Sequence, residues 1–353
     1  MNIAVLVSGG VDSAVSLRLL QQAGHTLTAF YLKIWLEDEL AYLGQCPWQE
    51  DLAYVQAICK QADVPLEILS LQREYHETVV AYTLAEIKVG RTPNPDIHCN
   101  SKIKFGFFME AIAHMNFDAI ATGHYAQVRH VDGVAQLHTA PDAIKDQTYF
   151  LAHLSQNQLK KAIFPIGGYT KEQVRALATE FDLANKDRKD SQGICFLGKL
   201  KFRDFIKHHL GVRTGKLVEA ETGAVMGDHD GFWFYTIGQR QGLGLAGGPW
   251  YVVEKSSETN MVFISRNYYS DDKKRNRFRV QDCHWIAQKA PIKNELTVKI
   301  RHGARYYNAI LREHGTQYEV LLNEDDQGLA PGQYAVFYDG TDCLGTGVIS
   351  CIL

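Results

Sequence analysis

Short apolar runs alternate with helical patterns over the first half of the chain. Four runs have the β-branched and aliphatic character of buried strands, and they lie at residues 3–7, 27–32, 66–69 and 119–122. Between them, apolar residues recur at helical spacing, at Val11, Val15 and Leu19 and again at Leu52, Val55, Cys59 and Ala62. This alternation predicts βαβ units on a parallel sheet, and therefore an α/β fold for the N-terminal part.

A further helix is predicted after Thr170, which is a suitable N-cap residue. Apolar residues follow it at intervals of three and four, at Val174, Leu177, Ala178 and Phe181. We expect this helix to close the α/β part near residue 185.

The second half of the chain has a different pattern. Glycines and aromatic residues dominate from about residue 205 to 265, with strand candidates at residues 232–235 and 251–253. We expect a small connecting α+β domain there. A polar run at residues 270–276 resembles a linker.

Beyond the linker, short alternating runs predict strands, at residues 296–300, 308–311, 318–322 and 334–338. Asp339-Gly340 is a hairpin turn signal. These features predict a C-terminal all-β barrel or sandwich. The expected domains are residues 1–204, 205–269 and 270–353.

Composition narrows the class of protein. With 353 residues, 46% hydrophobic and 22% charged, the chain has the balance of a folded globular protein. Its net charge of −3 gives no global basic field for nucleic acid or an anionic membrane. The seven cysteines include no C-x-x-C pair, which argues against a disulfide scaffold, a zinc site or an iron–sulfur cluster. No apolar stretch approaches the ~18 residues of a membrane span. We expect a cytoplasmic protein with no membrane partner.

The segment after the first strand is suited to binding phosphate. Leu6 and Val7 lead into Ser8, Gly9, Gly10, Val11, Asp12 and Ser13, and a helix follows. Glycines allow close approach of an anion, the two serine hydroxyls can donate, and the helix N-terminus presents N–H groups. The alternative is a glycine-rich turn that only packs tightly. There is no P-loop lysine. The loop resembles that of the ATP pyrophosphatases, which implies ATP as substrate and adenylation of an acceptor oxygen with release of pyrophosphate.

Two cysteines differ from the others because glycine, proline and aspartate surround them. Cys99 follows Asp96 in a segment that Pro93 and Pro95 should hold as a rigid loop. Cys195 lies in a second loop, and residues 185–216 carry nine Lys and Arg against three Asp. Such cations lower the pKa of a thiol if they converge on it. We expect buried, unreactive thiols at Cys59, Cys283, Cys343 and Cys351. The sequence does not assign Cys46 to either kind of thiol.

Taken together, these motifs resemble one family over essentially the whole chain, the tRNA-specific 2-thiouridylases. The matching segments are NPDIHCN (94–100), ATGHYA (121–126), KDQTYFL (145–151), DSQGICFLG (190–198), YTIGQRQGLGL (235–245), PWYVV (249–253) and PGQYAVFY (331–338).

The resemblance implies a mechanism with two thiols. ATP adenylates the C2 oxygen of a wobble uridine in tRNA, and Cys195 carries sulfur as a persulfide from a donor protein. Cys99 then releases the sulfur and leaves a transient Cys99–Cys195 disulfide. Asn94, Pro95 and Asp96 would form the base pocket, with Asp96 in proton transfer. An Asx-type turn cap is the alternative for Asp96.

The resemblance also implies further contacts, which are less specific. Leu32 and Gly123 match positions that line the adenosine. The positions that match tRNA contacts are His124, Lys145, Asp146, Gln147, Arg301, His302 and Gln333. Mg²⁺ is expected on the ATP phosphates, with Asp12 helping to orient it, and no residues are expected to form a separate metal site. The chain departs from the family at Leu32, Gln241 and His302-Gly303, which weakens the expected tRNA contacts more than the active site.

Two other functions remain open from the residues. An adenylating ligase acting on a small molecule would explain the loop but would not need Cys99 or Cys195. An RNA-binding protein with a regulatory nucleotide site would rely on the β-domain. Residues 271–353 contain eleven basic and eleven acidic residues, however, which is a small footprint for a general RNA binder.

Overall fold

A parallel sheet forms the centre of the N-terminal domain in the computed structural model, which describes residues 1–34, 47–189 and 202–353. Its strand order is β3-β2-β1-β4-β7. The bounds are β1 Asn2–Leu6, β2 Thr26–Lys33, β3 Leu66–Ser70, β4 Ala119–Ala121 and β7 Ala162–Ile163. All four neighbouring pairs are parallel, so the predicted α/β fold is confirmed.

Alternate residues of β1 point to two different cores. Ile3 and Val5 belong to one buried cluster, together with Leu17 and Val55 of the flanking helices. Those helices are α1 Val11–Gln22 and α3 Pro47–Ala62, and α10 Lys171–Glu180 packs beside α1. Thr170 and Gln173 form a capping box at the start of α10, which confirms the predicted helix.

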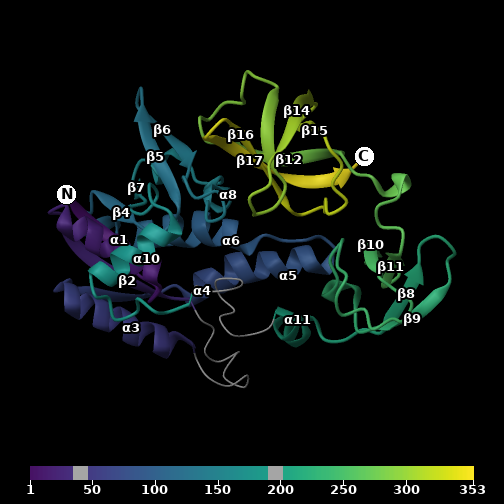
Figure 1. The fold of residues 1–353 in the computed structure, drawn as a ribbon, viewed down its shortest axis with the longest axis horizontal. Coiled ribbons are helices and arrows are strands. Elements are labelled where there is room, and N and C mark those ends of the chain that lie inside the picture. The colour runs from purple at the N-terminus through teal and green to yellow at the C-terminus, as the bar shows by residue number, and fades with distance from the viewer. Residues whose placement is uncertain (35–46, 190–201) are drawn as a thin grey trace.

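The second face of the sheet is covered by a chain of short helices. Ala4 and Leu6 share a buried cluster with Ile103 and Phe105. The helices are α4 Gln72–Tyr75, α5 Ala81–Lys88, α6 Pro95–His98 and α7 Phe108–Ala111, with π-helical segments at His76–Val80 and Cys99–Phe107. Shorter helices follow at Ala113–Met115, α8 Thr148–Leu151 and α9 Gln156–Leu159. In Figure 1, α5 and α6 lie beneath the C-terminal barrel and run from the N-terminal domain towards the connecting domain.

The connecting domain has a four-stranded sheet of order β10-β11-β8-β9 and one helix. Its elements are α11 Phe202–Leu210, β8 Gly215–Glu219, β9 Val225–His229, β10 Tyr251–Ser256 and β11 Met261–Ser265. The strand predicted at residues 232–235 is wrong, because Phe232–Phe234 forms a 3₁₀ turn. The side chain of Asn260 accepts the N–H of Phe232, so this N–H does not join a sheet.

The C-terminal domain is a closed antiparallel barrel, as predicted. The strands are β12 Arg277–Trp285, β13 Glu295–Lys299, β14 Tyr307–His314, β15 Gln317–Leu322, β16 Tyr334–Asp339 and β17 Asp342–Ile352, and pairing of β12 with β17 closes it. The predicted hairpin turn at Asp339-Gly340 joins β16 to β17. The segment before the barrel contains a short 3₁₀ turn at Asp271–Lys273.

A hairpin from the N-terminal domain extends the sheet of the barrel. Its strands are β5 Ala126–Val131 and β6 Val134–Thr139, and β6 pairs with the start of β17. His138 Nδ1 also lies 2.7 Å from a carboxylate oxygen of Asp342. The first and last domains are therefore joined by backbone pairing, which the sequence did not predict.

Candidate functional site

The predicted phosphate loop lies between β1 and α1. Gly9 has φ +78°, a conformation that favours glycine. Ser13 Oγ donates to the Gly10 carbonyl at 3.0 Å and accepts from the Ser8 N–H at 3.2 Å. The hydroxyl of Ser13 thus links Ser8 and Gly10 within the loop, and Ser8 remains exposed.

Gly123 lies against this loop at the end of β4. A Cβ atom at Gly123 would come within 2.7 Å of the Ser13 nitrogen, so a larger residue does not fit without movement. Leu32, near the end of β2, is half-buried and packs on the cluster that contains Leu6. Because β2, β1 and β4 are neighbours in a parallel sheet, these predicted nucleotide positions share its carboxyl edge.

Two residues that were not predicted from the sequence hold the loop. Asn185 Nδ2 donates to the Gly9 carbonyl at 2.8 Å, and Arg188 donates to the same oxygen at 3.0 Å. Arg188 also pairs with Asp51 and lies 4.8 Å from the ring centre of Tyr54. The sequence showed Arg188 only as one of a group of cations.

Asp12 is engaged at the start of α1. Lys171 Nζ donates to both carboxylate oxygens of Asp12, at 2.8 and 2.9 Å, and the Tyr125 hydroxyl donates at 2.8 Å. Within the described residues, no group of three or more His, Cys, Asp or Glu side chains is arranged to hold a metal ion.

Asn94, Pro95 and Asp96 form the start of α6. The Asn94 side chain caps the helix by accepting the Ile97 N–H at 3.3 Å, and Pro95 occupies the first helical turn. Pro95 suits this position because its missing N–H would be unpaired there anyway. Asn94, and not Asp96, is therefore the capping residue, and the Asp96 side chain remains partly exposed.

Cys99 is helical, which corrects the predicted loop. It begins the π-helical segment Cys99–Phe107, is 1% exposed, and belongs to the apolar cluster of Ile97 and Ile103. π-helical turns often occur at functional sites. Cys195 and Cys46 lie outside the described residues.

Hydrogen bonds connect the Cys99 helix to His124, next to the glycine that packs on the phosphate loop. Lys104 Nζ lies 2.9 Å from Asn100 Oδ1 and 3.5 Å from His124 Nε2. His124 is next to Gly123, and its Nδ1 is 2.7 Å from the Thr122 hydroxyl. Burial and the charge of Lys104 lower the pKa of His124 well below its usual value. His124 is 8% exposed, so the structure does not support its predicted contact with tRNA.

The predicted pair of residues Asp146 and Gln147 serves the fold. Asp146 is 1% exposed and forms an ion pair at 2.9 Å with the fully buried Lys299. The Gln147 side chain accepts the Tyr125 N–H at 3.0 Å. The expected contact of Asp146 with tRNA is therefore wrong for this structure, whereas Lys145 keeps a partly exposed side chain.

The barrel segment that leads to the predicted residue Gln333 contacts the chain just before α6. Thr92 donates its N–H to the Pro331 carbonyl at 2.8 Å, and Gly332 packs against Arg91 and Thr92. Gln333 follows directly, and its Oε1 is buried without a hydrogen-bond partner.

Arg301 and His302 lie next to each other, just after the end of β13. Arg301 is exposed and pairs with Asp326. The His302 ring stacks on Phe150, with centroids 4.5 Å apart. Burial lowers the pKa of His302, and the nearby charge of Asp96 acts in the opposite direction. The structure thus brings His302 close to the predicted base pocket.

The cations predicted to surround Cys195 are largely paired where the structure describes them. The pairs are Lys186 with Asp182, Arg188 with Asp51, Arg203 with Asp230 and Lys216 with Asp228. Their acidic partners reduce the local positive charge that the sequence count suggested.

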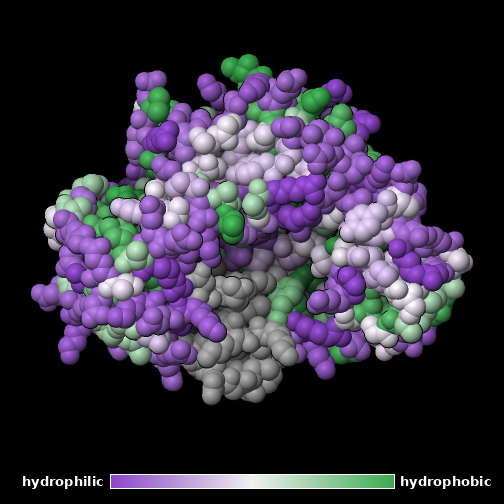
Figure 2. All heavy atoms as spheres, viewed as in Figure 1, coloured by the Kyte–Doolittle hydropathy of each residue, from purple (hydrophilic) through white to green (hydrophobic). Residues whose placement is uncertain are grey.

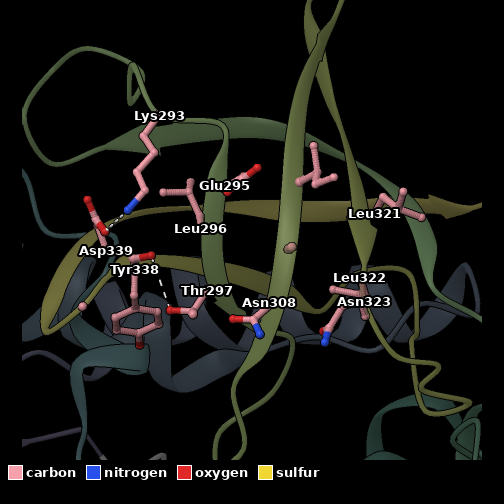
Figure 3. Close-up of a pocket in the computed structure, with 13 residues that line it drawn as sticks. Lys293, Glu295, Leu296, Thr297, Asn308, Leu321, Leu322, Asn323, Tyr338 and Asp339 are labelled. Atoms are coloured by element: carbon pink, nitrogen blue, oxygen red, sulfur yellow. Dashed lines mark hydrogen bonds and ion pairs between the residues drawn. The ribbon is translucent and has the colours of Figure 1, made fainter.

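A hollow lies near the middle of the face shown in Figure 2, below the barrel and between the N-terminal and connecting domains, and hydrophilic side chains border much of it. A separate pocket of about 420 Å³ lies on the barrel, among β13, β14 and β15. Figure 3 shows Lys293 and Asp339 paired at one end of this pocket. None of the predicted site residues lines it.

Comparison with known proteins identifies the family. Residues 1–199 match the profile described as a tRNA methyl transferase HUP domain, residues 203–266 the corresponding PRC-barrel domain, and residues 275–349 an aminomethyltransferase beta-barrel domain. A solved U34-tRNA thiolase NcsA from Methanococcus maripaludis is 17% identical, with a TM-score of 0.37 over 60% of this chain and 65% of that one.

Full-length relatives are much more similar. The tRNA-specific 2-thiouridylase MnmA of Parabacteroides distasonis is 46% identical over 99% of both chains. A protein of the same name from Bacteroides thetaiotaomicron, numbered 1, is 45% identical over 99% of this chain and all of its own. With such identity over its whole length, the chain belongs to the tRNA-specific 2-thiouridylase family.

Proposed function

We propose that the chain is an ATP-dependent tRNA sulfurtransferase that converts the C2 carbonyl of a wobble uridine into a thiocarbonyl. The observation that carries this proposal is the convergence on α6 of three parts of the chain. Asp96 stands on α6 and Cys99 directly after it, and Lys104 links the following helix to His124 beside the phosphate loop. The barrel touches the segment before α6 at Thr92 and the end of α6 at His98.

Residues 6–13, with Leu32 and Gly123, would hold ATP at the carboxyl edge of the parallel sheet. The close packing of Gly123 on the loop supports this assignment. The residues present offer Mg²⁺ no open carboxylate here, because Lys171 donates to both carboxylate oxygens of Asp12, so the ion would be held by the ATP phosphates and water. Bound Mg²⁺ would neutralise phosphate charge.

The first chemical step makes the uridine oxygen a leaving group. The C2 oxygen attacks the α-phosphorus of ATP, pyrophosphate departs, and the base loses its N3 proton. Asp96 is the proposed acceptor of that proton, since its carboxylate is partly exposed beside Asn94 and Pro95.

The second step transfers sulfur. A donor protein loads Cys195 with a persulfide, whose outer sulfur is delivered to C2 as AMP leaves. Cys99 attacks the inner sulfur, so the sulfur–sulfur bond of the persulfide breaks and a Cys99–Cys195 disulfide forms. An external thiol must then reduce this disulfide before the next turnover.

The three domains divide the work in this proposal. Residues 1–204 carry out adenylation and sulfur transfer, and residues 205–269 and 270–353 grip tRNA. The proposed tRNA contacts are Lys145, Gln147, Arg301, His302 and Gln333. None of the described helices combines the length and apolar character needed to cross a membrane. We place the enzyme in the cytoplasm, where tRNA and a reducing environment are both found.

The test is mass spectrometry of nucleosides from unmodified tRNA incubated with the protein, Mg-ATP and a persulfide donor. Exchange of one oxygen for sulfur in uridine is the expected product. An added methyl group would instead match the name of the domain profiles. Unaltered tRNA with active donor and folded protein would contradict the proposal.

A further inference from the structure

Tyr334 of the barrel contacts the last residue of helix α6 and a neighbouring helix. Its hydroxyl lies 2.9 Å from His98 Nε2, at the last residue of the helix. Its carbonyl accepts the Tyr149 hydroxyl at 3.0 Å, and Tyr149 lies on α8, which packs against α6. One barrel residue therefore binds both the end of the single turn that carries Asp96 and the helix packed beside that turn.

Tyr82 completes this connection from the opposite side. Its ring stacks on His98, with centroids 3.8 Å apart and planes 22° apart. Its hydroxyl accepts the Asn94 N–H at 3.5 Å. His98 is thus held between a stacked ring of α5 and a hydroxyl of the barrel.

Two more imidazoles surround Tyr334. His153 packs edge-on to the Tyr334 ring, and it stacks on His284 with centroids 4.9 Å apart. His284 is fixed by a 2.9 Å contact to the Leu154 carbonyl. Burial lowers the pKa of both His98 and His153 to about 4, so each ring is neutral near pH 7. The rings of His98 and His153 are therefore suited to fixing the positions of their neighbours and not to transferring a proton.

We propose that Tyr334 and His98 are positioning residues that set the helix bearing Asp96 and Cys99 against the barrel, so that adenylation and sulfur transfer act on the same docked base. This inference rests on the proposed function. His98 directly precedes Cys99, and Asp96 lies one turn before it. A small shift of this turn would move the carboxylate and the thiol together relative to a base held by the barrel.

Loss of this positioning should uncouple the two steps. An adenylated uridine that waits too long for sulfur reacts with water, which returns uridine and AMP. The diagnostic quantity is the ratio of AMP released to 2-thiouridine formed, because a loss of folded protein lowers both products equally.

The experiment compares wild type with Tyr334→Phe, which removes only the hydroxyl, and with His98→Phe and His98→Gln. Tyr318→Phe, elsewhere in the barrel, is the matched control. We expect Tyr334→Phe and His98→Phe to lower kcat for thiolation about tenfold, since small misplacements of reacting groups have effects of this size or larger. KM for tRNA should stay within about twofold of wild type, because no tRNA contact is removed.

The ratio of AMP to 2-thiouridine should rise above one in both variants, and His98→Gln should restore part of the coupling through its amide. An unchanged ratio, or AMP and 2-thiouridine falling in parallel, would overturn the inference. If wild type itself forms no 2-thiouridine, the proposed function fails instead, so the two failures are distinct.

Discussion

Lys299 of the barrel donates a hydrogen bond to Asp146 of the N-terminal domain at 2.9 Å, and both side chains are withdrawn from solvent. The Thr148 hydroxyl donates to the same carboxylate, and the ring centre of Tyr306 lies 4.3 Å from Lys299 Nζ. This buried pair fixes the barrel on the segment that leads into α8.

Substitution Lys299→Met should destabilise the protein by about 3–5 kcal/mol, because it leaves the Asp146 carboxylate buried without its cation. Equilibrium urea unfolding measures this loss. The matched control is Lys293→Met, which breaks the exposed pair with Asp339 and should cost at most about 1 kcal/mol. Equal effects of the two substitutions would contradict the role of Lys299.

Gly123→Ala should weaken ATP binding at least about tenfold, a change of about 1.4 kcal/mol. The added Cβ would meet the Ser13 nitrogen at 2.7 Å and displace the loop. Calorimetric titration with a non-hydrolysable ATP analogue provides the measurement. Gly168→Ala is the control, since nothing lies within 4 Å of its Cβ position. Normal binding by Gly123→Ala would remove this glycine from the nucleotide site.

Acid should destabilise the protein partly through His98 and His153. Burial lowers the pKa of each from 6.5 to about 4. The unfolded chain therefore binds protons in this window that the folded chain does not, so stability is complete above pH 6.5 and falls as the pH drops towards 4.

The variant His98→Gln should show a shallower loss of stability over this window, by at most about 1.4 kcal/mol per pH unit. Urea unfolding of wild type and variant at several pH values gives the two slopes. Parallel slopes would show that His98 titrates normally in the folded protein.

Local patterns predicted the parallel sheet, the helix that Thr170 caps and the position of the loop between β1 and α1, because those depend on neighbours in sequence. The hairpin of β5 and β6 was missed because its partner strand β17 lies some 200 residues away. Asp146 was expected to contact tRNA because its position matches such a contact in the family, and nothing near it in sequence reveals Lys299. The helical conformation of Cys99 was missed because Pro95 was read as a helix breaker, although it starts α6.

The proposed reaction requires both Cys99 and Cys195. Nucleoside mass spectrometry of tRNA treated with wild type, Cys99→Ser and Cys195→Ser tests this requirement. Each reaction contains Mg-ATP and a persulfide donor, and Cys59→Ser is the control because Cys59 lies in the core of the N-terminal domain. We predict 2-thiouridine with wild type and Cys59→Ser and none with either of the other variants, while AMP formation with tRNA persists. Undiminished 2-thiouridine from Cys99→Ser or Cys195→Ser would contradict the account.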